Sequence, residues 1–503
     1  MAVAEHDRST VPDGSTEQWR DKKRYLWLLG LVIPSLAIIA IVTFLLTGWT
    51  WVVWIGPILI LGIVPAIDLV AGLDRSNPPE EIIEALEKDR YYRWITFFYL
   101  PIQYVGLVGA TAALAGHNPV GWTAERLGVA SWLAQYGWGA DLVVDDLHLT
   151  LVQKIGIAVS IGCVGGIGIN TAHELGHKKE SHERWLAKIA LAQSFYGHFY
   201  IEHNRGHHVR VATPEDPASS RVGESFYQFW PRTVWGSLRS AWRLERKRYA
   251  RKHQHPYRIG NDVLNAWLMS SVLFATLTVL FGLGVLPYLV LQAVVGFSLL
   301  EVVNYMEHYG MRRQMVGIEG RRRYERVNPS HSWNSNNIAT NVLLYHLQRH
   351  SDHHANPTRR YQTLRDFKES PALPTGYAGM IVLAVVPAIW RRVMDPRVLA
   401  HFDGDMSRAN LSPRHREAVL ARYPVPTGPQ VVGTDPTVLG VDGEILTARC
   451  PGCSYVYEVA AGDEHEGFPA GTAWREIPDS WCCPDCGVRE KVDFVPVERA
   501  VAD

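Results

Sequence analysis

The sequence predicts a mainly α-helical membrane protein: a bundle of six transmembrane helices with histidine-rich helices on the cytoplasmic side, followed by a small domain of strands and cysteine turns. Three observations predict this fold class. Long apolar runs alternate with densely charged segments along 503 residues, of which 47% are hydrophobic. Histidines recur at helical spacing in three clusters, and two Cys-x-x-Cys pairs stand near the C-terminus.

Six apolar runs are long enough to cross a bilayer. The first is uncharged over residues 25–46, and at about 1.5 Å per residue it reaches roughly 33 Å. It lacks the small-residue cleavage site of a signal peptide, so we expect it to remain in the protein. The second contains Pro57 and Pro65, which membrane helices tolerate when neighbouring helices satisfy the backbone. The expected spans are residues 25–46, 49–73, 94–115, 152–169, 263–281 and 286–303.

The distribution of Lys and Arg predicts the orientation of the spans. Basic residues precede the first span, lie between the second and third, and are dense between the fourth and fifth. The loop over residues 116–150 contains only Arg126, and residues 282–285 contain none. Because basic loops remain on the cytoplasmic side, we expect a multi-pass protein of the cytoplasmic (inner) membrane, with both termini and every metal site facing the cytoplasm.

The histidine clusters predict a centre with two metal ions. His173 and His177 are four residues apart, as are His203 and His207, so each pair can aim at one point from a helix. His208 follows directly. The third cluster, His350, His353 and His354, has a spacing that stacks its side chains on one helical face. Imidazole binds iron, zinc, copper or nickel, and one catalytic zinc needs only three protein ligands, so eight histidines indicate two ions.

The sixth apolar run ends in polar residues that extend this centre. Glu301, Asn304 and His308 fall on one helical face, and we take His308 as a ninth imidazole. A carboxylate near hydrocarbon is costly unless it is paired, so Glu301 is either a partner of the metal centre or a polar contact between helices. Glu307, Glu202 and Asp216 are weaker carboxylate candidates. The histidines assigned to the protein core, or lying near the clusters but off their spacing, are His117, His148, His198, His255, His182, His331 and His346.

The first cluster also permits a different reading. His173-Glu174-x-x-His177 is the zinc-protease signature, with two ligands and a general base. It predicts a membrane-embedded protease with a single zinc, but such a site would leave the other two clusters without a role.

From residue 391 onward, charged residues, prolines and glycines indicate a tether with one short helix near residues 414–422. Beyond it, Cys450 and Cys453 form one Cys-x-x-Cys pair, and Cys483 and Cys486 form the other. Two such pairs predict a tetrahedral four-sulfur site for zinc or iron. Cys482 stands outside this pattern, and Cys163 lies within the fourth span.

The residues around these pairs resemble the rubredoxin pattern. Cys-x-x-Cys-x-Tyr-x-Tyr continues through Pro-x-Gly-Thr-x-Trp to Trp-x-Cys-Pro-x-Cys-Gly over residues 446–497, with Ser454 in place of the usual glycine. The resemblance implies one iron held by Cys450, Cys453, Cys483 and Cys486, which carries one electron at a time.

The histidine clusters resemble those of the integral-membrane di-iron alkane 1-monooxygenases. The similarity covers His173-Glu-Leu-Gly-His177-Lys, Glu202-His203-Asn-Arg-Gly-His207-His208, Asn304-Tyr-Met-Glu-His308-Tyr-Gly and His350-Ser-Asp-His353-His354, and extends to about residue 367. It implies two irons held by the nine histidines and hydroxylation of the terminal carbon of n-alkanes by O2. The implied divisions are residues 1–24 as a cytoplasmic tail, 25–390 as the hydroxylase, 391–445 as the linker and 446–498 as the fused rubredoxin.

The charge distribution suggests how the two parts meet. Residues 446–498 contain 4 basic and 10 acidic residues, a net charge of −6, so the rest of the neutral chain has +6. Opposite charges favour association, and Arg359, Arg360 and Arg365 are the candidate landing surface. We expect an NAD(P)H-dependent rubredoxin reductase as electron donor, the lipid bilayer as surroundings and no nucleic-acid partner. A fatty-acyl desaturase or hydroxylase with the same histidine clusters is the alternative.

Overall fold

The computed structural model describes residues 19–136, 146–316, 322–426, 445–453 and 455–497. Within them, six helical segments are long and apolar enough to cross a membrane, so the predicted fold class is confirmed and the chain is a multi-pass membrane protein. Each span overlaps its expected position. The spans are Leu26–Thr47, Thr50–Ala71, Arg90–Leu114, Leu151–Gly176, Asp262–Phe281 and Leu283–Glu307.

Five spans consist mainly of one regular helix, and the second is divided into short pieces. Its two prolines lack a backbone N–H, so the hydrogen-bond ladder changes type along its length. The main helices are α1 (Val32–Thr47) after a 3-10 turn η1 (Leu26–Leu31), α5 (Arg90–Leu114), α8 (Leu151–Gly176), α13 (Asp262–Phe281) and, after η6 (Leu283–Val285), α14 (Leu286–Glu307). The second span contains η2 (Thr50–Trp54), α2 (Ile55–Ile58), the π turn η3 (Leu59–Ile63) and α3 (Val64–Ala71).

Helices α8 and α14 pack closely because glycines line their contact. A Cβ added to Gly162 would lie 2.7 Å from the Gln292 carbonyl oxygen, and one added to Gly166 would lie 2.9 Å from the Gly296 carbonyl oxygen. Small residues let the two backbones approach, which is a common packing mode in membranes. This contact fixes the ends of α8 and α14, which carry His173, His177 and His308.

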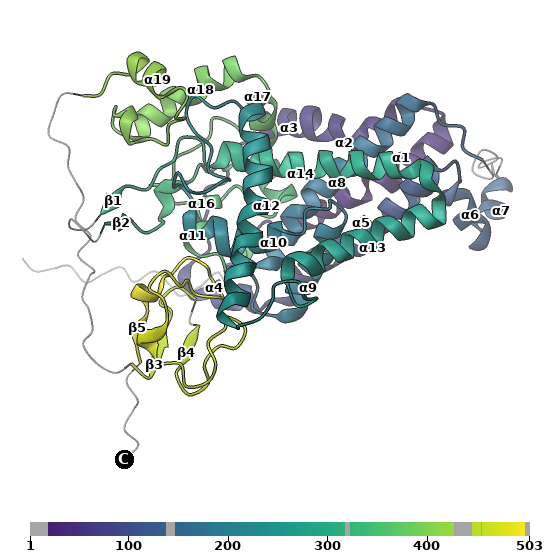
Figure 1. The fold of residues 1–503 in the computed structure, drawn as a ribbon. Helices are drawn as coiled ribbons and strands as arrows, with labels where there is room; N and C mark the ends of the chain where they lie inside the picture. Colours follow the sequence, from purple (N-terminus) through teal and green to yellow (C-terminus); the bar gives the residue numbers. More distant parts are fainter. Residues whose placement is uncertain (1–18, 137–145, 317–321, 427–444, 454, 498–503) are drawn as a thin grey trace, which may run out of the picture.

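Shorter helices and the long helix α12 gather at the end of the bundle where α8 and α14 finish (Figure 1). They bring together segments that are far apart in the sequence, including two histidine clusters. Around this end lie α4 (Glu80–Lys88), α9 (Ser181–Ala192), α10 (Phe199–Glu202), the π turn η5 (His203–His207), α11 (His208–Arg210), α12 (Phe226–Arg251), η7 (Pro329–His331), α15 (Ile338–Leu343), α16 (His350–Ala355) and η8 (Tyr361–Thr363). Helices α6 (Pro119–Arg126) and α7 (Val129–Ala134) lie at the opposite end (Figure 1).

The first part of the predicted tether is packed structure. Trp390, Met394 and Val398 are fully buried and share a core with Tyr305 and Tyr309 at the end of α14. The Tyr309 hydroxyl donates to Asp395 at 2.9 Å. Charged residues dominate this segment in sequence because only one face of its helix is buried. The helices are α17 (Tyr377–Ala384), α18 (Pro387–His401), η9 (Met406–Arg408) and α19 (Arg416–Arg422), the last lying where the short helix was expected.

The C-terminal part forms a separate small core, which we call the cysteine domain (residues 445–497). Its sheet has the order β4-β3-β5, and every pairing is antiparallel. Trp474, Trp481 and Phe494 pack inside it against the buried cysteines. The strands are β3 (Thr447–Arg449), β4 (Val456–Glu458) and β5 (Val495–Pro496), with short turns η10 (Trp474–Glu476) and η11 (Lys491–Asp493). A hairpin of β1 (Met315–Val316) and β2 (Arg323–Tyr324) belongs to the larger part.

Candidate metal centre

Nine histidines gather where α8 and α14 end, and they form two groups. Within each group, one ring nitrogen from every histidine lies within 4.8 Å of the others, and all nine side chains are buried. The five-histidine group contains His173, His177, His203, His208 and His353. The four-histidine group contains His207, His308, His350 and His354. The structure therefore brings together every histidine that spacing selected.

The second cluster divides between the groups because its helix changes type. Residues His203–His207 form a π turn, in which hydrogen bonds join residues five apart. His203 and His208 therefore share a face, and their Nε2 atoms are 3.0 Å apart. His207 faces the other group. The prediction that His203 and His207 aim at one point is wrong, because it assumed α-helical periodicity.

The third cluster also supplies both groups. His350 and His354 lie one turn apart on α16, with their Nε2 atoms 2.8 Å apart in the four-histidine group. His353 points to the other group, where its Nε2 is 3.2 Å from that of His208. Helix α16 thus lies between the two groups, whereas sequence spacing had placed its histidines on a single face. His308 follows the end of α14, with its Nε2 3.2 Å from that of His350.

The chemistry of this donor set fits metal ions. The Nε2 atoms of His173, His177 and His207 are buried and have no hydrogen-bond partner in the structure. A buried polar atom without a partner costs free energy, which a bound cation would recover. Burial, followed by the charge of neighbouring histidines, lowers the pKa of His177 and of His208 well below the ordinary value. These imidazoles are therefore neutral at physiological pH, which is the form that binds metals.

Two carboxylates contact the histidines from outside the groups. Asp216 accepts a hydrogen bond from His207 Nδ1 at 2.9 Å and another from the Ser219 hydroxyl at 2.6 Å. Burial disfavours its charged form, but His207 and Ser219 outweigh that cost and lower the pKa of Asp216 below its ordinary value. Such a contact fixes the ring orientation of a metal-binding histidine. On the other side, a Glu307 carboxylate oxygen lies 3.2 Å from His350 Nε2.

Glu301, the favoured carboxylate in the sequence, contacts other helices instead. It accepts hydrogen bonds from Tyr196 at 2.7 Å, Thr233 at 2.8 Å and Asn304 at 3.2 Å. These contacts join α14 to α12 and to the segment before α10. Helical spacing showed which face Glu301 shares with His308, but it could not show which neighbours would reach that face.

An ion pair crosses the outside of the π turn. Arg210 donates to Glu202 at 2.8 Å and to the Ser240 hydroxyl of α12 at 2.7 Å. Gly206 lies beneath this bridge, and a Cβ there would collide with the Glu202 carboxylate and lie 2.7 Å from Arg210. Its position beside the second cluster made Glu202 a possible ligand, whereas no sequence pattern indicated a role for Arg210 or Gly206.

Glu174, which would be the general base of a zinc protease, contacts other residues instead of the histidines. Its carboxylate pairs with Lys178 at 2.9 Å and accepts the backbone N–H of Tyr361 at 3.2 Å. His173 and His177 meanwhile share their group with three further histidines. The geometry does not match a zinc-protease site, which needs two histidines and a carboxylate poised beside one ion.

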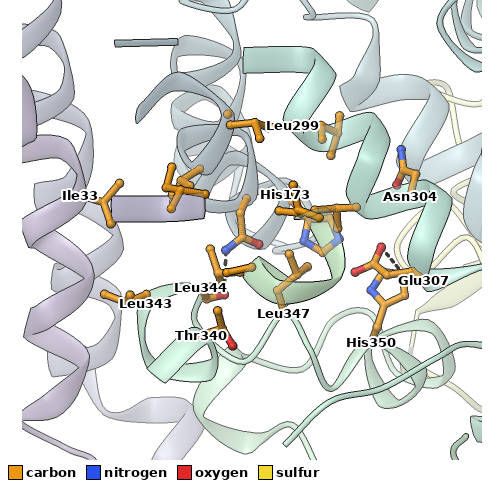
Figure 2. A pocket seen from close by; sticks show the side chains of 18 of the residues that line it. Ile33, His173, Leu299, Asn304, Glu307, Thr340, Leu343, Leu344, Leu347 and His350 are labelled. Carbon is orange, nitrogen blue, oxygen red and sulfur yellow. Dashed lines mark hydrogen bonds and ion pairs between the residues drawn. The ribbon is translucent and has the colours of Figure 1, made fainter. Parts of the chain in front are cut away.

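An apolar cavity reaches both histidine groups (Figure 2). Its wall includes His173 and His203 from one group and His350 from the other. Glu307 and Asn304 are among the few polar side chains at this end, while Ile33 of α1 lies at the far side. The remaining lining residues are Ile60, Val64, Gly166, Ile167, Asn170, Phe199, Leu299, Leu300, Val303, Thr340, Leu343, Leu344, Leu347, Ala378 and Ile381. This lining suits a hydrocarbon chain whose end meets the histidines.

The cysteine domain contains the predicted four-sulfur group. Cys450, Cys453, Cys483 and Cys486 are all buried and within 4.8 Å of one another. The Gly452 backbone N–H donates to the Cys450 sulfur at 3.4 Å, a contact that stabilises thiolate charge. None of the four forms a disulfide, so all four sulfurs are available as ligands. The expectation about the Ser454 turn lies outside the described residues.

The cysteine domain rests on the histidine-bearing end of the bundle (Figure 1). Lys179 donates to the Cys453 carbonyl at 2.5 Å, and Arg251 pairs with Glu466 at 3.2 Å. Arg205 also pairs with Glu466, and Arg326 pairs with Asp493. We call Lys179, Arg205, Arg251 and Arg326 the docking surface.

The predicted landing residues do not form this surface. Arg359 pairs with Asp352, Arg360 with Glu180 and Glu183, and Arg365 with Glu80, all within the larger part of the chain. The prediction that they receive the cysteine domain is therefore wrong. They followed the third cluster in sequence, whereas docking occurs beside the second. The sequence feature that could have indicated the docking site is Arg205, a basic residue inside the second cluster.

The other histidines lie outside both groups, as expected. His346 contacts Lys23 at 2.8 Å and the Tyr361 carbonyl at 2.9 Å, and His331 contacts Glu325 at 3.3 Å. The remaining histidines set aside in the sequence analysis are also outside the two groups.

Comparisons with known proteins agree with this division of the chain. The fatty acid desaturase family matches residues 152–384, and the rubredoxin family matches residues 447–494. Alkane 1-monooxygenase 1 of Alcanivorax borkumensis is 42% identical over 82% of this chain and 94% of its own length. Alkane 1-monooxygenase of Ectopseudomonas oleovorans is 43% identical over 81% of this chain and 94% of its own. Rubredoxin 3 of Rhodococcus erythropolis is 65% identical over 10% of this chain and 80% of its own length. The histidine groups fit a di-iron site, and the cysteine group matches a rubredoxin iron site.

Proposed function

Because the chain belongs to the alkane 1-monooxygenase family, we propose that it hydroxylates the terminal carbon of n-alkanes to 1-alkanols with O2. Electrons come from its own cysteine domain. One observation carries this proposal: the apolar cavity is bounded at one end by histidines of both groups. A hydrocarbon chain lying in it would present one end to the metal centre and keep the rest among aliphatic side chains.

The proposed ligands of two irons are His173, His177, His203, His207, His208, His308, His350, His353 and His354. The proposed ligands of the third are Cys450, Cys453, Cys483 and Cys486. When bound, the two histidine-held irons supply activation of O2 and transfer of one oxygen atom to carbon. The other oxygen atom leaves as water, which consumes two electrons.

The protein's own side chains prepare the site for this chemistry. Nine buried imidazoles from several segments face one another in two groups. Asp216 holds the ring of His207, and Glu307 contacts His350. The lining of the cavity excludes water and orients the chain, because a methyl end is the only part of an n-alkane that differs in shape.

Electrons reach the cysteine domain from an NAD(P)H-dependent rubredoxin reductase in this proposal. An iron held by the four cysteines would carry one electron at a time, so the reductase must deliver an electron twice per turnover. A separate reductase is the proposed source, because the two matched families supply the hydroxylase and the one-electron carrier.

We place the protein in the cytoplasmic (inner) membrane with the metal sites on the cytoplasmic side. The support is the density of basic residues at the histidine-bearing end, including those of α12, against Arg126 alone in the loop over residues 116–150. We also assign residues 1–24 to a cytoplasmic tail, 25–390 to the hydroxylase, 391–445 to the linker, whose first part packs on the hydroxylase, and 446–498 to the rubredoxin.

A fatty-acyl desaturase or hydroxylase is the second candidate, favoured by the family match over residues 152–384. Purified protein in liposomes, supplied with NADH, a rubredoxin reductase and a liquid n-alkane, separates the two. We expect three irons per chain and a 1-alkanol. An unsaturated product would favour the desaturase, and a single zinc without O2 uptake would contradict both.

A further inference from the structure

The π turn His203–His207 contacts the histidine groups on one side and the cysteine domain on the other. Inward, His203 belongs to the five-histidine group and His207 to the four-histidine group. Outward, Arg205 pairs with Glu466 of the cysteine domain. Arg205 is only two residues along the backbone from His203 and from His207. No other described segment contacts both the cysteine domain and both histidine groups in this way.

The second cysteine turn packs directly on the backbone of the π turn. Gly487 directly follows Cys486, and a Cβ placed on it would collide with the carbonyl oxygen of Asn204. The same position is 3.7 Å from the Cβ of His208. Only a residue without a side chain permits this contact. The path from the Cys486 sulfur thus runs through covalent bonds to Gly487, crosses one contact to the Asn204 carbonyl, and continues along the π turn to His208.

Charged contacts on both sides hold the turn in this place. Glu466 is 4% exposed and receives Arg205 and Arg251, the latter also donating to its backbone carbonyl at 2.6 Å. Asp493 is 9% exposed and pairs with Arg326. Buried pairs of this kind fix the register of an interface, because a shifted partner would leave a charge unpaired.

We propose that electrons pass into the histidine centre at the π turn, from Cys486 through Gly487 to Asn204 and His208 of the five-histidine group. The inference rests on the proposed function. Each transfer oxidises a ferrous ion in the cysteine group by one electron and reduces a ferric ion in the histidine centre by one electron. No bond forms or breaks, and two transfers complete a turnover.

The test follows a single transfer in the full-length chain. The cysteine iron is reduced in anaerobic protein whose histidine centre is oxidised, and its visible absorption is followed as it returns to the ferric state. No alkane or O2 is needed. A first-order rate that does not depend on protein concentration is expected, since the donor docks on its own chain. A rate proportional to concentration would overturn the proposal.

Two substitutions with matched controls locate the path. Gly487→Ala forces the contact with Asn204 apart, whereas Gly471→Ala has the same kind of positive φ but nothing within 4 Å of its added Cβ. Both carry a left-handed backbone cost of about 1 kcal/mol, so the comparison isolates the contact. We expect Gly487→Ala to slow the transfer at least about tenfold relative to Gly471→Ala, with the visible spectrum of the cysteine iron unchanged. Equal rates would overturn the proposal.

Charge reversal tests the docking. Glu466→Arg leaves Arg205 and Arg251 facing a like charge, while Glu464→Arg makes the same change at an exposed position two residues away. We expect the first to slow transfer by roughly tenfold or more and the second to have little effect. Adding Arg251→Glu to Glu466→Arg should restore part of the rate.

Normal electron transfer without alkanol formation would refute the proposed function alone. Alkanol formation with an unchanged transfer rate in Glu466→Arg would refute this inference alone.

Discussion

His203 and His207 lie four residues apart in one helical segment, yet their imidazoles belong to different histidine groups. A π turn separates them, and the same turn brings His203 Nε2 within 3.0 Å of His208 Nε2. The two groups are therefore linked covalently through a single turn of backbone. A shift in that turn would displace ligands of both groups together.

Removing His207 or His208 should affect different ions. His207→Ala leaves three histidines in its group, and His208→Ala leaves four in the other. We expect His207→Ala to lose iron more readily on dialysis against a chelator, since fewer ligands remain, and the double variant to lose both ions. Iron per chain, measured by elemental analysis, checks this. His182→Ala, at an exposed histidine outside both groups, is the control and should retain all three irons.

Gly206→Ala should disturb the π turn. Its added Cβ would meet the Glu202 carboxylate and Arg210, which must move apart or bend the turn. Overpacking of this kind typically costs about 1–3 kcal/mol. Gly62→Ala makes the same change in the other π turn, η3, where nothing lies within 4 Å.

We expect Gly206→Ala to lower iron content and shift the Mössbauer signals of both histidine-held ions, while Gly62→Ala changes neither. An unchanged Mössbauer spectrum in Gly206→Ala would contradict this prediction. It would mean that Glu202 and Arg210 move aside to make room for the added Cβ while the histidines keep their positions.

Much of the architecture follows from the sequence because it depends on patterns along the chain. Apolar run length predicted six spans, and cysteine spacing predicted a four-sulfur group. The predictions that were wrong concerned contacts between segments that are far apart in the sequence. The π turn has the sequence of an ordinary helix, so nothing local separated His203 from His207. The arginines after the third cluster were assigned to docking, but Glu180, Glu183, Asp352 and Glu80, all distant or unranked in sequence, already neutralise them.

Glu307→Gln should weaken the four-histidine group. Glu307 lies 3.2 Å from His350 Nε2, and its other oxygen has no hydrogen-bond partner. Because this Nε2 also faces His308 and His354, the carboxylate lies on the metal side of the ring, where its charge attracts a bound cation. We expect iron to leave this group at a lower chelator concentration, with the five-histidine ion unchanged by Mössbauer spectroscopy.

Glu301→Gln is the matched control for that variant. Its contacts are with Tyr196, Thr233 and Asn304, and the amide oxygen can still accept from two of these donors. We expect both irons to be retained. If Glu301→Gln lost iron as easily as Glu307→Gln, the carboxylate favoured in the sequence would be the one that matters to the metals.

Ile33→Trp should shorten the alkanes that the enzyme accepts. Ile33 is 1% exposed and lies at the side of the cavity away from Glu307 and His350 (Figure 2). A larger side chain there leaves the histidine end intact and removes room for the distal part of a chain. Because each methylene in an apolar pocket is worth about 1–3 kcal/mol, the ratio of long-chain to short-chain turnover should fall by roughly tenfold or more. Ile39→Trp adds the same bulk on α1 at a position that is 46% exposed, so it should leave the ratio unchanged. Product analysis by gas chromatography with alkanes of graded length measures both, and an equal loss of all lengths in Ile33→Trp would mean that the chain does not extend toward α1.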